Sequence, residues 1–316
     1  MKPIWHQTIE AAEKYNEPGK FTAFIGYEWT SLLKGNNLHR VVIYKDGASE
    51  ARQTLPFTLE DSADPERLWD AMQAYEEKTG GDLLAIPHNG NLANGIMVDV
   101  ETLSGKPIDK DYASRRQQWE PLYESTQIKG DGEAHPFLSP DDEFADYVTW
   151  DLGNLDMSAP KTDDMLAGEY ARSGLKRGLE FEEKLGVNPY KFGQIGSTDS
   201  HTSLPAVEEN NFFGKHSGGE PSPERASHVV IGGENGKIMG HQMASSGYAA
   251  VWAKENTRQA IFDARSRKET YATTGSRMAV RFFGGWDFTE ADANSRQPAE
   301  AGYSRGVPMG GNLSQV

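Results

Sequence analysis

Five residues of this chain combine metal-binding side chains with positions beside short apolar runs. Glu28 follows "FTAFIGY", His39 lies at the start of "LHRVVIY", and His88 ends "LLAIPH". Asp199 and His201 stand in "GSTDSH", directly after "KFGQIG". Imidazole and carboxylate suit Zn, Mn or Fe, and a glutamate can bridge two ions about 3.5–4 Å apart. These residues predict a centre for one or two divalent metal ions.

Taken singly, each residue also has an ordinary structural interpretation, as a solvated acid or a hydrogen-bonded histidine. The prediction depends on what they share, because four of the five follow an apolar strand. In a parallel barrel such strand ends meet on one face, where active sites are built. We therefore expect Glu28, His88, Asp199 and His201 to lie in one coordination shell.

The composition narrows the classes of partner. The chain carries 47 acidic and 32 basic residues, a formal charge of -15, and no Lys/Arg run with interleaved aromatics, which argues against nucleic-acid binding. It has no cysteine, so any metal must be held by His, Asp or Glu. Neither an apolar signal region nor a run of 18 apolar residues occurs, so we expect no membrane span and a cytoplasmic chain.

Alternating helix and strand patterns predict an α/β fold with parallel strands. The expected strands cover 21–29, 38–44, 82–88, 191–201, 270–275 and 277–286, and the expected helices 4–15, 61–81, 139–150, 163–186 and 255–269. Residues 99–136 are expected to form loop with short elements. One domain is expected over 1–288, with a long insertion or lid at 203–246 and an irregular tail at 289–316.

The combination "GYEW", "NLHRVV", "IPHN" and "GSTDSH", in this order, resembles the polymerase and histidinol phosphatase (PHP) superfamily of metal-dependent phosphoesterases. More narrowly, nearly the whole chain resembles a branch catalogued as a domain of unknown function. The resemblance implies a distorted, incomplete (β/α) barrel. It also implies that Glu28 is the bridging carboxylate, that His39 and His88 are ligands, and that Asp199 and His201 close the site.

The chain departs from that superfamily at its start. Members begin with a strand bearing a His-x-His pair and then an Asp-His pair, whereas this sequence has no His-x-His. We therefore expect a barrel lacking its first strands, and full-length relatives that are exported in some cases. Either fewer metals bind, or His6, His135 or a partner chain supplies a ligand. The exposed strand edge predicts a two-fold homodimer.

The resemblance implies a hydrolase that cleaves phosphate esters with metal-activated water, with Glu28, Asp199 and His201 as catalytic residues. Contacts to a small anionic or ester substrate are expected from Arg40, Lys129 and His135, with Lys215 as a further cation. Two alternatives stay open. The same centre could hydrolyse a carbamate, ester or lactone, or the chain could be a metal-binding remnant without turnover.

Overall fold

The computed structural model describes residues 1–204, 214–243 and 247–314, so the expected insertion at 203–246 lies partly outside the described residues. The helices are α1 (Lys2–Tyr15), α2 (Ala48–Ala51), α3 (Pro65–Thr79), α4 (Lys110–Trp119), α5 (Asp163–Leu166), α6 (Ala171–Leu185), α7 (Arg258–Ser266), α8 (Glu290–Ala293) and α9 (Pro298–Arg305). The strands β1 to β7 are Gly26–Trp29, Leu32–Leu33, Asn36–Asn37, Arg40–Tyr44, Leu83–Pro87, Leu122–Gln127 and Gly130–Asp131. The strands β8 to β14 are Gly193–Gly196, Val229–Gly233, Gly236–Met239, Tyr248–Val251, Thr270–Thr273, Phe283–Gly284 and Val307–Pro308.

The strands form several small sheets, and no sheet among the described residues closes into a barrel. One sheet has the order β1-β4-β5 and is antiparallel throughout; another has the order β7-β6-β8, with β6 and β8 parallel. The expected incomplete (β/α) barrel is therefore wrong, and the fold is mixed α/β. The prediction of parallel strands is wrong for β1, β4 and β5, because alternation of helix and strand does not fix strand direction. Strand β1 is joined to β4 through the short β2–β3 hairpin, a connection too short for a parallel crossover.

The antiparallel register nevertheless brings the expected ligands to one sheet end. Trp29, the last residue of β1, pairs with Arg40, the first residue of β4, and Arg40 also pairs with Pro87 at the end of β5. Glu28, one residue before the end of β1, and His88, directly after β5, therefore lie near His39, which directly precedes β4. This is why His39, at a strand start, joins the two residues from strand ends.

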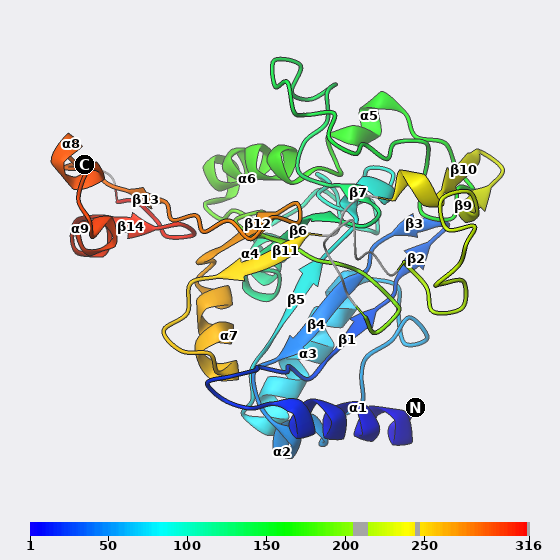
Figure 1. Cartoon of the computed structure of the whole chain (residues 1–316), viewed down its shortest axis with the longest axis horizontal. Coiled ribbons are helices and arrows are strands. Elements are labelled where there is room, and N and C mark those ends of the chain that lie inside the picture. The colour runs from blue at the N-terminus through cyan, green and yellow to red at the C-terminus, as the bar shows by residue number, and fades with distance from the viewer. Residues whose placement is uncertain (205–213, 244–246, 315–316) are drawn as a thin grey trace.

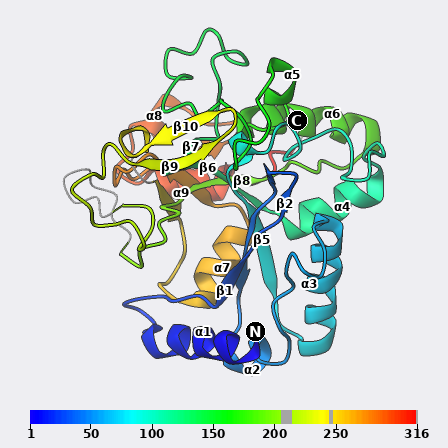
Figure 2. The same cartoon turned by 90° about the vertical axis from the view of Figure 1, so that its right-hand side faces the viewer.

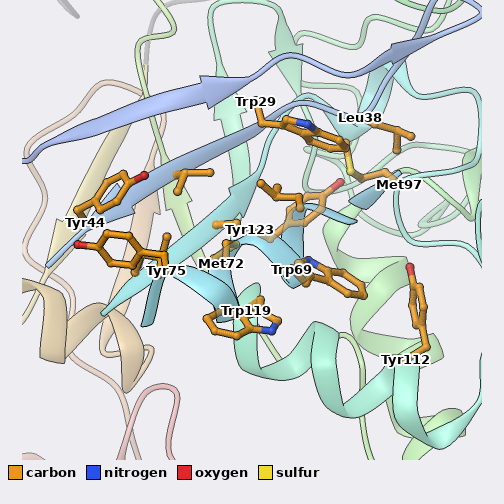
Figure 3. Close-up of a cluster of buried hydrophobic side chains, with 14 of the residues drawn as sticks. Trp29, Leu38, Tyr44, Trp69, Met72, Tyr75, Met97, Tyr112, Trp119 and Tyr123 are labelled. Carbon is orange, nitrogen blue, oxygen red and sulfur yellow. The ribbon is translucent and has the colours of Figure 1, made fainter. Parts of the chain in front are cut away.

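Helices cover both faces of the β1-β4-β5 sheet (Figures 1 and 2). Successive residues of a strand point to opposite faces. On β4, Val42 and Tyr44 join the cluster that contains Leu68, Trp69 and Met72 of α3, whereas Val41 and Ile43 pack with Phe262 of α7. Figure 3 shows the first cluster, whose aromatic side chains fill the space between α3, α4 and the sheet.

The structure confirms the helix predicted over 61–81, which is α3. The Asp64 side chain accepts a hydrogen bond from Glu66 N, Pro65 occupies the first turn, and Gly80 ends the helix with a φ of 70°. Leu68, Trp69, Met72 and Tyr75 form its buried face. Helix α4 was missed because its buried face includes a paired arginine, Arg116, so no apolar stripe marks the sequence.

Three further expectations need correction. Residues 139–150 form turns instead of a helix: Trp150 and Val148 pack into a hydrophobic cluster at the end of the segment, whereas Phe144 is exposed. The helix expected over 163–186 is broken between α5 and α6, and the tail contains α8, α9 and β14, which stand apart from the body in Figure 1.

Within the described ranges, no helix has the length and apolar character that crossing a membrane requires. Strand β1 lies at an edge of its sheet, as the expected dimer requires, but the dimer itself stays a prediction.

Candidate metal centre

Glu28, His39 and His88 meet at the end of the β1-β4-β5 sheet, each with a possible ligand atom within 4.8 Å of the others. Oε1 of Glu28 lies 2.7 Å from Nδ1 of His39 and 3.4 Å from Nε2 of His88. The two imidazole rings make an edge contact with centroids 5.5 Å apart. One carboxylate and two imidazoles are a donor set that catalytic zinc sites use, with a fourth position open.

Glu28 also belongs to a second group, with Asp199 and His201, whose possible ligand atoms again lie within 4.8 Å of one another. Nε2 of His201 lies 3.4 Å from Oδ1 of Asp199. The Asp199 side chain is 9% exposed and that of His201 is 50% exposed, so this group opens to solvent. Because Glu28 is common to both groups, the five expected ligands form one continuous cluster.

The backbone around these ligands is constrained. Asp199 has a φ of 46°, in the left-handed region that non-glycine residues rarely occupy, and Asn89, directly after His88, has a φ of 50°. The buried Asn37 side chain donates to the carbonyl oxygens of His88 at 2.6 Å and of Asn89 at 3.0 Å. His88 N donates to the carbonyl oxygen of His39 at 3.3 Å. The two histidines are therefore positioned by the backbone as well as by Glu28.

A chain of side-chain amides continues from Asn89 toward β6. Gln127 Nε2 donates to Asn89 Oδ1, and Gln127 Oε1 accepts a hydrogen bond of 2.6 Å from Lys129 N. This link fixes the turn between β6 and β7 relative to His88. It places the Lys129 side chain inside the cluster.

Two buried lysines face Asp199. Nζ of Lys129 contacts Oδ2 of Asp199, and Nζ of Lys215 lies 2.6 Å from the same oxygen. Lys215 also donates to the Asp199 carbonyl oxygen. The two residues are 6% and 5% exposed, respectively. Burial lowers the pKa of both ammonium groups, that of Lys215 to about 8, and the neighbouring Lys215 charge lowers the pKa of Lys129 further.

Glu124 is a site residue that the sequence did not reveal. It is 4% exposed on β6, Oε2 accepts from Ser197 Oγ, and its charge acts on Lys129 and Lys215. All six residues of β6 are buried, so the strand shows no alternation that would single out a functional carboxylate. "LYESTQ", with a glutamate inside a strand, is the one signal that was available.

The histidines control the charge of Glu28. Burial by itself would raise the pKa of the Glu28 carboxyl, but hydrogen bonds and charge from His39 and His88 outweigh burial and hold the pKa well below its ordinary value. Burial lowers the pKa of His39 and of His201. An ionised carboxylate and neutral imidazoles are the protonation states in which these groups bind metal ions.

Two of the expected substrate contacts lie elsewhere. Arg40 is 1% exposed; its Nε lies 3.0 Å from Oε1 of Glu120, and Nη1 donates to the carbonyl oxygen of Leu38. We assign it a structural role. Nε2 of His135 lies 3.3 Å from Oδ2 of Asp151, and the His135 ring contacts the Tyr170 ring at a tilt of 52°. Neither His135 nor His6 belongs to a described ligand group.

The cluster fits a divalent cation. Nε2 of His39, Nδ1 of His88 and Oε1 of Glu124 are buried without a hydrogen-bond partner among the described residues. Burying such polar atoms costs free energy unless a ligand, an ion or water binds them. With carboxylate and imidazole donors and no thiolate, the cluster suits Zn, Mn or Fe.

Comparisons with known proteins place the chain in a family. No curated protein and no solved structure matches it. The expected membership of the PHP superfamily is wrong, because nothing in the comparisons supports it and the sheets do not form its barrel. One family matches over residues 1–316, and the chain therefore belongs to the family described as "Protein of unknown function (DUF3604)".

Proposed function

We propose that this protein is a divalent-cation-dependent hydrolase that cleaves phosphate esters. The observation that carries the proposal is the position of Glu28, which takes part in both groups of possible ligands. A carboxylate shared in this way is what a two-cation centre requires, and either group alone supports one cation. A cation bound here would lower the pKa of water and polarise the ester.

The residues of the chain supply the other functions of such a site. The Lys129 and Lys215 ammonium groups can pair with phosphoryl oxygens. The His201 ring is half exposed and lies beside the His216 ring, with centroids 5.0 Å apart, so it can exchange a proton with a leaving group that enters from solvent. The left-handed backbone at Asp199 is the kind of strained conformation that clusters at active sites.

The test is cation content together with turnover. The purified chain is stripped with chelator, reloaded with Mn²⁺ or Zn²⁺, and assayed on phosphate mono- and diesters and on carboxyl esters, carbamates and lactones. We expect phosphate ester turnover that needs the cation and is lost in Glu28→Gln, while Glu17→Gln, an exposed acid on the α1–β1 connection, serves as control. Turnover that survives chelation would overturn the proposal, as would a chain that binds no cation.

A further inference from the structure

The Asp199 carboxylate has two kinds of partner. It belongs to a group of possible cation ligands with Glu28 and His201. Its Oδ2 atom is also the shared counterion of Lys129 and Lys215. One carboxylate carries a single negative charge, so it cannot neutralise two ammonium groups and also hold a cation with full strength. Binding at one of these partners must therefore change the other.

A bound cation would reverse the balance of charge around the lysines. Three carboxylates act on the pair, those of Asp199, Glu28 and Glu124. When both lysines are protonated, this leaves one excess negative charge. A single divalent cation changes the balance to one excess positive charge, in a place where both lysines are more than nine-tenths buried. Buried charge of one sign needs a counterion.

The shape of the pair favours a tetrahedral oxyanion. Both Nζ atoms contact one oxygen from different directions, since Lys129 comes from the β6–β7 turn and Lys215 from the described segment that begins at residue 214. His201 lies at the solvent side of the same carboxylate. An anion with several equivalent oxygens can accept from both ammonium groups and still face the cation.

We propose that Lys129 and Lys215 form an oxyanion-binding pair that Asp199 neutralises until a divalent cation takes its carboxylate, so that the cation and a phosphate-type dianion strengthen each other's binding. The inference rests on the proposed cation centre, and it selects substrates that carry a terminal dianionic phosphoryl group over neutral esters. Linkage between two binding sites is reciprocal, so bound phosphate must increase the affinity for the cation by the same factor.

Calorimetric titration of inorganic phosphate into the chelator-stripped chain and into the Mn²⁺-loaded chain measures the coupling without any turnover, with the heat of Mn²⁺ and phosphate alone subtracted. We expect Mn²⁺ to increase the affinity for phosphate at least about fivefold, which is the lower end of typical coupling between sites. Lys129→Met and Lys215→Met should each lose this gain and keep their Mn²⁺. Lys45→Met is the matched control, because Lys45 is also held by two carboxylates, those of Asp82 and Asp263, at the opposite end of β4.

Asp199→Asn gives the most specific outcome. The neutral amide no longer neutralises the lysines, so the stripped variant should bind phosphate at least about fivefold more tightly than the stripped wild type, and Mn²⁺ should add little. The inference would be overturned if stripped Asp199→Asn bound phosphate more weakly than the stripped wild type. It would also be overturned if the affinity of the wild type for phosphate were the same with and without Mn²⁺. If the wild type binds no Mn²⁺, the proposed function fails, but the stripped variants still test the lysine pair. Thermal melting confirms that each variant is folded.

Discussion

Oε1 of Glu28 lies 2.7 Å from Nδ1 of His39 because the antiparallel register of β1 and β4 turns a strand end toward a strand start. The same oxygen faces His88, and the same residue belongs to the group with Asp199. Both groups of possible cation ligands therefore depend on one carboxylate.

We expect Glu28→Gln to weaken cation binding at both positions by at least about tenfold. Mutation of a residue that only hydrogen-bonds to a metal ligand already costs about tenfold in affinity, and loss of a ligand should cost no less. His201→Ala should affect only the second position, because Glu28, His39 and His88 remain. Elemental analysis after dialysis against limiting Zn²⁺ measures the stoichiometry. A Glu28→Gln chain that retains the wild-type cation content would contradict the shared-carboxylate arrangement.

The buried pair of Arg40 and Glu120 predicts a loss of stability without a loss of cation. Glu120 is 3% exposed and also accepts from Trp69 Nε1. Arg116 Nε also lies 3.1 Å from Oε2 of Glu120, so removing Arg40 leaves this acid with one of its two guanidinium partners. The loss of one such buried hydrogen bond to a charged group costs about 1–3 kcal/mol. We expect Arg40→Met to lower the free energy of unfolding by that amount in urea titrations and to keep its cations.

The control for that variant is Arg67→Met, which breaks an exposed pair with Asp70 on α3. A pair of this kind contributes about 0–1 kcal/mol, so the change should be small. If Arg40→Met were as stable as wild type and instead weakened substrate binding, Arg40 would be a substrate contact after all.

How far the sequence predicts the site is clearest from His39 and Glu124. The apolar runs beside Glu28, His39 and His88 locate the ligands, and the structure brings these three together. The expected cause of their convergence, parallel strand ends, is wrong, because the registers of β1, β4 and β5 are antiparallel. Side-chain chemistry and strand ends were readable from the sequence, but strand direction was not, because it depends on connections that span many residues.

Local patterns do not reveal Glu124, and although the sequence suggests Lys129 and Lys215 as substrate-binding cations, it does not predict their contact with Asp199. Lys215 contacts Asp199 from 16 residues away, and Ser197 reaches Glu124 across 73 residues. The contact between Ser197 and Glu124 arises from the pairing of β6 with β8, whose register shifts between Glu124 and Thr126, and the contact of Lys215 accompanies the bridge between His201 and His216. Arg40 shows the converse, since a cation beside a ligand suggested substrate binding, whereas its partner is a distant buried acid.

Gly168 permits a close backbone approach that a larger residue cannot make. A Cβ atom there would overlap the carbonyl oxygen of Gly95. Because backbone atoms cannot yield as a flexible side chain can, we expect Gly168→Ala to destabilise the protein by about 1–3 kcal/mol. Gly218→Ala, where nothing lies within 4 Å of the added atom, should be close to neutral. Equal urea midpoints for the two variants would contradict the packing at Gly168.

Glu76 predicts a pH dependence of stability that is independent of the metal centre. The pKa of its carboxyl is raised from an ordinary value of 4.5 to about 7 by burial first and then by the nearby Asp82 and Asp46 carboxylates, against a hydrogen bond from the Leu83 backbone. The folded chain therefore holds a proton between these two values that the unfolded chain releases. Stability from this group is complete below about pH 4.5 and is lost as the pH rises through 7.

We expect Glu76→Gln, which cannot ionise, to gain stability relative to wild type as the pH increases from about 5 to about 8, across the window in which the folded chain loses its proton. Urea unfolding at the two pH values measures this difference. Glu77→Gln, on the exposed side of α3, controls for the effect of glutamine on the helix. A Glu76→Gln chain whose stability relative to wild type is the same at both pH values would show that Glu76 releases its proton at its ordinary pKa.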